Sequence, residues 1–144
     1  MLYFNVCEKG VCMETKRSVL REKIMVILYQ LDIADAQKIK ASIDDTIKDN
    51  VPIENEFVKQ IVYGCVTYKT QIDNMANKYM NDWTIDRIDK TGAAILRMAI
   101  YELLYTDTPE IVVINEAIEL SKKYSDDNVR KIINAVLDKI IKDR

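Results

Sequence analysis

Two arginines and a tyrosine on one predicted helix are the first side chains whose types and spacing point to a chemistry. Arg17 and Arg21 are four residues apart, so a helix places them on one face that continues towards Tyr29. Guanidinium groups bind phosphates, and an aromatic ring offers a surface on which a nucleobase stacks. Together with Lys16 at the helix start, they predict a nucleic-acid surface. A ring at the edge of the hydrophobic core is an equally weighted interpretation of Tyr29.

A second group consists of polar residues inside apolar helical patterns. Arg97 lies within the segment Ala94–Leu104, and Asn115 and Glu116 lie within the segment Ile111–Tyr124. Burying such groups without partners is costly, so each is expected to form hydrogen bonds with another helix. We predict a structural polar network that fixes how the helices register, with an ion pair between Arg97 and Glu116 as one hypothesis.

The usual groups for catalysis and metal binding are scarce. The chain has no histidine, which removes the commonest general base, and only three glycines, which form no phosphate-binding loop motif. Its cysteines, Cys7, Cys12 and Cys65, lack a metal-ligand spacing, and Cys65 is expected to be a reduced thiol in the core. The sequence therefore predicts a protein that is not an enzyme and needs no metal or cofactor.

The charge is distributed unevenly along the chain. The net charge is −2, but residues 13–23 carry +2, residues 122–144 carry +3, and residues 24–121 carry −7. If the two ends of the chain meet in space, they form a basic patch on an acidic body, which is the distribution that phosphate recognition needs. An equally weighted alternative is that the C-terminal lysines only complement a helix dipole.

Apolar residues recur at helical spacing along most of the chain, and no run alternates as a strand would. Helices are predicted over Lys16–Leu31, Ala36–Lys48, Ile53 to about Met80, a segment that starts near a cap at Thr84 or Asp86 and includes Ala94–Leu104, Ile111–Tyr124, and Asp127 to about Lys142. Ser125 and Asp126 are the expected caps of the last helix. The fold class is therefore all-α, with six or seven helices.

Nothing in the composition indicates a membrane segment or an export signal. The longest apolar run, Ile24–Tyr29, is far too short to span a bilayer, and residues 1–12 lack the features of a signal peptide. We expect a cytoplasmic protein. Residues 1–12 precede a second methionine, Met13, so they are expected to be a disordered leader or a mis-assigned start, and translation from Met1 or from Met13 stays open.

Several blocks of sequence occur together in an order that resembles one known family. They are Arg21-Glu22 followed by LYQL at 28–31, the string ILRMAIYELL at 95–104, Pro109, VVINEAIELSKKY at 112–124, and IINAVLDKI at 132–140. In order and spacing they resemble the NusB family of bacterial transcription antitermination factors, over nearly all of the chain from about Lys16. The resemblance implies two three-helix bundles, about 13–82 and 83–144, in a single RNA-binding domain.

The resemblance also implies a function and its partners. NusB proteins bind the boxA segment of nascent RNA together with NusE, a small-subunit ribosomal protein, and help RNA polymerase pass terminators, notably in ribosomal RNA operons. The resemblance further implies that RNA is bound by the arginine-rich start of the first helix, by the tyrosine that matches the family pattern, and by the last loop and helix. The corresponding residues are Lys16, Arg17, Arg21, Tyr29, Asn128 and Lys131. Asn134 matches a family asparagine and joins the predicted structural network.

This chain departs from the family pattern where basic residues are thinned at the start of the first helix, with Val19 and Leu20 in their place. Two other functions are therefore kept as hypotheses. One is a stand-alone NusB-like module related to RNA cytosine methyltransferases, and the other is a helical scaffold that self-associates as a homodimer. The sequence leaves open the RNA preference, the oligomeric state and whether NusE is required.

Overall fold

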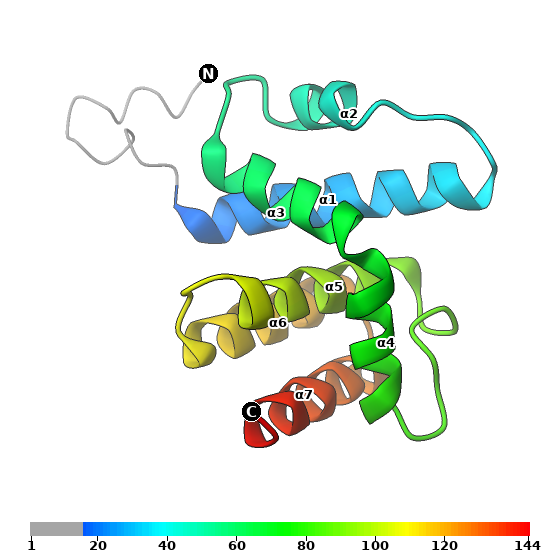
Figure 1. Cartoon of the computed structure of the whole chain (residues 1–144), viewed down its shortest axis with the longest axis vertical. Helices are drawn as coiled ribbons and strands as arrows, with labels where there is room; N and C mark the ends of the chain where they lie inside the picture. The colour runs from blue at the N-terminus through cyan, green and yellow to red at the C-terminus, as the bar shows by residue number, and fades with distance from the viewer. Residues whose placement is uncertain (1–15) are drawn as a thin grey trace.

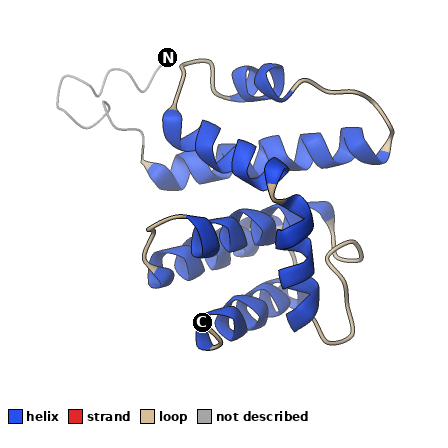
Figure 2. Ribbon diagram, viewed as in Figure 1, coloured by secondary structure: helices blue, strands red, loops and turns tan. Residues whose placement is uncertain are grey.

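Seven α-helices and no strand make up residues 16–144, which are the residues described by the structure, a computed structural model (Figures 1 and 2). The helices are α1 (Arg17–Ala36), α2 (Ile43–Asn50), α3 (Glu56–Thr67), α4 (Lys69–Tyr79), α5 (Lys90–Tyr105), α6 (Glu110–Tyr124) and α7 (Asp127–Lys142). The all-α fold class predicted from the sequence is confirmed. Residues 1–12, the predicted leader, lie outside the described residues.

Short polar side chains fix where four of the helices begin. Ser42, Asn55, Asp89 and Asp126 each accept a hydrogen bond from a backbone N–H in the first turn of α2, α3, α5 and α7. Asp126 was one of the expected caps of the last helix. The expectation that Thr84 or Asp86 caps the helix containing Arg97 is wrong, because that helix begins later, at Lys90, and its N-cap is Asp89.

Two predicted helix boundaries differ from the structure. The single helix expected over Ile53 to Met80 is two helices, because the chain turns at Tyr68 between α3 and α4 (Figure 1). The first helix is longer than expected and ends at Ala36, where Lys38 adopts a left-handed conformation with φ 58° that a helix cannot contain. The segment 37–42 is therefore not helical, so the helix predicted over Ala36–Lys48 begins only at Ile43, and Ile39 is exposed.

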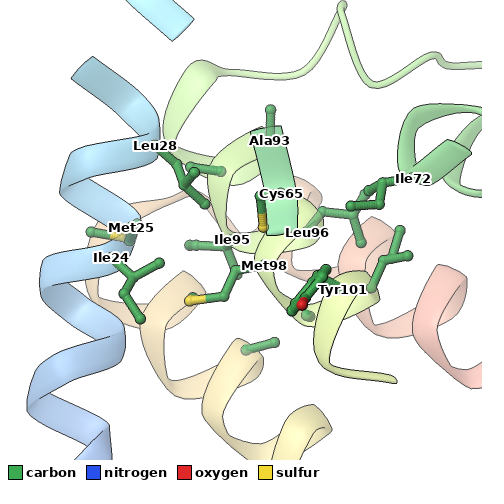
Figure 3. Packing of buried hydrophobic residues seen from close by; sticks show 14 of the residues in the cluster. Ile24, Met25, Leu28, Cys65, Ile72, Ala93, Ile95, Leu96, Met98 and Tyr101 are labelled. Atoms are coloured by element: carbon green, nitrogen blue, oxygen red, sulfur yellow. The ribbon is translucent and has the colours of Figure 1, made fainter. Parts of the chain in front are cut away.

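Helix α5 is the centre of the packing. It contacts α1, α3, α4, α6 and α7, and every residue from Gly92 to Leu103 is buried. Figure 3 shows Ile95 and Met98 of α5 beside Ile24 and Leu28 of α1. Residues from all seven helices belong to one hydrophobic cluster, so the division into two bundles stays a prediction.

Close helix contact explains the glycine inside α3. A Cβ on Gly64 would collide with the ring of Tyr101 on α5, so the absence of a side chain lets the two helices approach each other. On α6 the buried residues are Val113, Ala117, Leu120 and Ser121, whereas Ile111, the first residue of the predicted helix Ile111–Tyr124, is 69% exposed. No helix within residues 16–144 is long and apolar enough to cross a membrane.

Candidate nucleic-acid interface

The outer side of α1 is joined to α6 by polar contacts. Ser18 Oγ donates a hydrogen bond to Glu116 Oε2 at 3.0 Å. One turn along α1, Glu22 Oε2 accepts hydrogen bonds from Lys123 Nζ at 2.9 Å and from Tyr124 Oη at 2.8 Å. The two basic segments of the sequence, 13–23 and 122–144, are therefore in direct contact through Glu22 and Lys123.

The other exposed candidate residues follow the two sides of this contact along the chain. Tyr29 follows Glu22 by seven residues, two helical turns and about 10 Å along the same face of α1, and it is 39% exposed. Asn128 and Lys131 are exposed on the first turns of α7, which follows α6 after only two residues. We call the following group the α1–α7 surface: Glu22, Tyr29, Lys123, Tyr124, Asn128 and Lys131.

Arg17 faces a different part of the molecule. Its guanidinium carbon lies 4.4 Å from the centre of the Phe57 ring on α3, a cation–π contact. Arg17 and Phe57 line an open hollow of about 570 Å³ beside the α5–α6 turn. A row of residues at four-residue spacing winds by about 40° per step, so Arg17 is turned by about 120° from Tyr29 around α1. Lys16, which precedes the helix, is exposed.

Arg21 is not available to a phosphate. Its side chain is 4% exposed, and its Nε and Nη2 atoms donate hydrogen bonds of 2.8 and 2.7 Å to the two carboxylate oxygens of Glu102 on α5. Its Nη1 lies 3.6 Å from Glu116 on α6. The expectation that Arg17 and Arg21 present two free guanidinium groups on one face is therefore wrong, because the second is buried in an ion pair.

The surroundings of these charged groups shift their pKa values in the directions that the contacts predict. Hydrogen bonds from Lys123 and then Tyr124 lower the pKa of Glu22. The hydrogen bond to Glu22 in turn raises the pKa of Lys123 and of Tyr124. For Arg21, burial alone would lower the pKa, but the bonds to Glu102 outweigh burial and raise it. All these groups keep their ordinary charges near neutral pH.

Arg97 forms a separate network that faces away from Glu116. Its Nε and Nη2 atoms donate to the Asp73 carboxylate on α4 at 2.8 and 3.2 Å, and its Nη1 donates to Asp32 on α1 at 3.2 Å. Lys90 approaches Asp32 to 3.4 Å. The hypothesis of an Arg97–Glu116 pair is therefore wrong. Arg97 joins α5 to α1 and α4, whereas Glu116 joins α6 to α1.

The two asparagines of the predicted polar network are not in it. Asn115 and Asn134 are both exposed, on α6 and α7. Both asparagines were predicted to be buried because their neighbours in sequence are apolar. In the structure, the buried faces of α6 and α7 lie to one side of them. Burial therefore does not force either residue to have a partner.

The sequence prediction missed four residues that organise this region. Glu102 is 2% exposed and occurs in the same apolar segment as Arg97, so the rule that flagged Arg97 would also have found it. Glu22 belongs to the Arg21-Glu22 motif, and its spacing from Tyr29 on the same helical face is a signal for it. Lys123 and Tyr124 end the motif at 112–124, which carries no sign of a role in RNA binding. For these two, the contact with α1 is not visible in the sequence.

A family model and two relatives each match most of this chain. The family model described as "NusB family" matches residues 18–142. Transcription antitermination protein NusB of Staphylococcus aureus strain JH9 is 41% identical over 127 residues, which is 88% of this chain and 98% of that protein. The NusB protein of strain Newman shows the same values.

Solved structures of similar fold include two informative relatives. T. maritima NusB superposes with a TM-score of 0.81 at 26% identity, over 91% of this chain and 94% of that one. A chain from the crystal structure of antitermination factors NusB and NusE in complex with dsRNA superposes with a TM-score of 0.75 at 26% identity, over 89% of this chain and 97% of that one.

Proposed function

Because the chain belongs to the NusB family of transcription antitermination proteins, which are not enzymes, we propose that it binds boxA RNA through the α1–α7 surface. NusE is the proposed protein partner, since a structural relative of this chain occurs with NusE and RNA. The pair would act on RNA polymerase in the cytoplasm, notably in ribosomal RNA operons.

The observation that carries this proposal is the contact between α1 and α6. It joins the two basic segments of a chain whose remainder is acidic, and the exposed Tyr29 lies about 10 Å further along the same face of α1. Contacts between lysines and phosphates supply a large share of the free energy of nucleic-acid binding, and an aromatic ring adds stacking with the bases of single-stranded RNA. The α1–α7 surface combines both kinds of group.

Roles follow from the positions of the side chains. Tyr29 is the proposed stacking residue, and Lys131 with Asn128 contacts the RNA backbone or a base edge. Lys16 and Arg17 are the proposed phosphate contacts at the start of α1, for RNA that winds around the helix from the face that carries Tyr29. Arg21 acts indirectly, because its bonds to Glu102 hold α1 against α5.

The acidic remainder of the chain suits a basic ribosomal protein, which supports NusE as the partner. The relatives that are covered over 98% of their length carry the antitermination name, and this favours antitermination over the methyltransferase-related alternative. Self-association is a separate prediction, and sedimentation velocity of the protein without RNA would test it.

Fluorescence anisotropy with a labelled boxA-like RNA tests the proposal, with and without NusE, against a scrambled RNA of the same length. We expect specific binding that NusE tightens. Lys131→Ala should weaken it and reduce the dependence of log K on log salt by about 0.7, the value for one phosphate contact on a single strand. Equal affinity for both RNAs, with and without NusE, would overturn the proposal.

Lys142→Ala is the matched control for this experiment. Lys142 is an exposed lysine at the other end of α7, paired with Asp138 at 3.0 Å. The substitution removes the same charge and should leave RNA affinity nearly unchanged. Arg21→Ala is unsuitable as a binding variant, because it would leave the buried Glu102 carboxylate without its positively charged partner and destabilise the protein.

A further inference from the structure

One carboxylate lies among the candidate RNA-binding groups. A single oxygen of Glu22 accepts hydrogen bonds from both Lys123 Nζ and Tyr124 Oη. The Glu22 side chain is 30% exposed and the Lys123 side chain 64% exposed, so a molecule that docks on the α1–α7 surface would reach both. In the absence of RNA, Glu22 therefore neutralises a lysine that would otherwise face incoming phosphates.

The position of Glu22 makes this neutralisation relevant to RNA. Glu22 shares a face of α1 with Tyr29, and Tyr124 precedes Asn128 by four residues. RNA that stacks on Tyr29 and contacts the start of α7 would pass close to the Glu22 carboxylate. A carboxylate repels phosphates, so its presence there calls for an explanation.

The fold does not depend on this ion pair. Helix α1 is held to α5 by the buried Arg21–Glu102 pair and to α6 by Ser18 and Glu116, and its residues Leu20 and Ile24 lie in the core. An exposed ion pair contributes little to stability in comparison. The bonds of Glu22 to Lys123 and Tyr124 are therefore free to break without releasing α1.

We propose that Glu22 is an intramolecular counter-ion that RNA phosphate displaces, so that Lys123 and Tyr124 turn from the carboxylate to the RNA backbone on binding. This inference rests on the proposed RNA-binding function. A lysine has a flexible stem and three rotatable donors, and a tyrosine hydroxyl also binds phosphate oxygens, so both groups are able to make this exchange. Lys123 and Tyr124 are then RNA-binding residues, and Glu22 lowers the affinity for every RNA.

A double-mutant cycle tests the exchange, with the boxA-like RNA and NusE in the anisotropy assay. Glu22→Gln should tighten binding by about two- to fivefold, the range of an exposed ion pair. Lys123→Ala should weaken binding and reduce the salt slope by about 0.7. In the Lys123→Ala background, Glu22→Gln should have a clearly smaller effect, because only the release of Tyr124 and the loss of one repulsive charge remain. Thermal unfolding without RNA should show that all variants are folded.

Glu54→Gln is the matched control. Glu54 is exposed on the loop before α3 and holds Lys59 at 3.0 Å, so the substitution removes the same charge and releases a lysine elsewhere. It should leave RNA affinity unchanged. A gain as large as that of Glu22→Gln would overturn the inference, because net charge alone would then explain the effect.

Two further results separate this inference from the proposed function. If the wild-type protein binds the boxA-like RNA specifically and Glu22→Gln does not tighten binding, or tightens it equally without Lys123, the inference is overturned and the function stands. If the wild-type protein shows no preference for the boxA-like RNA even with NusE, the proposed function is overturned and this inference with it.

Discussion

Arg21 and Glu22 are neighbours in sequence but have opposite surroundings. Arg21 points into the protein, where both oxygens of the buried Glu102 bind its guanidinium group. Glu22 points outwards and binds Lys123 and Tyr124 at the surface. A single step along α1 therefore separates an ion pair inside the core from one in contact with water.

The difference shows that burial, rather than the kind of residue, determines whether the partners of an ion pair can be exchanged. Removing one partner of a buried pair leaves a charge without water or a counter-ion, so such a pair cannot be exchanged. A surface pair gives up little when water or another ion replaces a partner. The inner pair therefore fixes the position of α1, and the outer pair is available for function.

The buried Arg21–Glu102 pair is tested most directly by a substitution of Glu102. Glu102→Gln should destabilise the protein by about 3–5 kcal/mol, because the buried Arg21 loses the carboxylate that binds it through both oxygens and keeps only the longer 3.6 Å contact with Glu116. Urea denaturation followed by circular dichroism measures the change. The exposed Glu119→Gln on α6 is the control and should have little effect. A loss below 1 kcal/mol would mean that water reaches Arg21.

The Arg97 network should respond less, because its acids are closer to water: the side chains of Asp73 and Asp32 are 19% and 12% exposed, against 2% for Glu102. Asp73→Asn should cost about 2 kcal/mol, the value of hydrogen bonds to a charged group, since Arg97 keeps its bond to Asp32. The control is Asp86→Asn, because Asp86 is 82% exposed and 3.8 Å from Arg97. Equal losses for the two variants in urea denaturation would show that Asp73 has no special role.

The same distinction between inside and outside explains what the sequence could predict of the fold. The spacing of apolar residues predicted that the segments are helical, and α7 has the predicted bounds, Asp127 and Lys142. The break at Tyr68 was missed because the apolar spacing of Phe57, Ile61 and Cys65 continues across it to Ile72. Periodicity records which side of a helix is buried, but not whether two helical segments share one axis.

The candidate site was harder to predict, because contacts between helices decide it. Arg17 and Arg21 have the same side chain, yet one is exposed and the other is bound to a residue 81 positions away. The predicted Arg97–Glu116 pair is wrong for a similar reason, since sequence spacing does not show which of several carboxylates meets the buried Arg97. Sequence spacing predicted which residues share a face of a helix, and tertiary packing determined what that face meets.

A substitution of Tyr29 tests whether this exposed residue of α1 serves RNA binding rather than stability. Tyr29→Ala should weaken binding of the boxA-like RNA by about fivefold, or about 1 kcal/mol, the lower end of the range for stacking one base. Stability should change little, because the ring is 39% exposed. Tyr29→Phe keeps the ring and should bind like the wild type. Loss of stability without loss of affinity would identify Tyr29 as a core-edge residue instead.

The smallest effect is expected from acid at Glu22. Its pKa in the folded protein is below the ordinary value of 4.5 because of Lys123 and Tyr124. A carboxylate with a lowered pKa contributes stability above the unfolded-state pKa, and this contribution is lost as the pH falls through the folded-state value. The wild-type protein should therefore be slightly more stable than Glu22→Gln at pH 7, by the small amount typical of an exposed ion pair.

This difference between the two proteins should disappear as the pH falls below about 4.5, because a protonated glutamate is a close neutral analogue of glutamine. Urea denaturation of both proteins between pH 7 and pH 3 measures it, and comparing the two curves cancels the titration of the other carboxylates. Adding salt at pH 7 should also reduce the difference, since exposed charges are screened. A difference that persists at pH 3 would show that Glu22 stabilises α1 through packing, and the outer pair would then resemble the inner one.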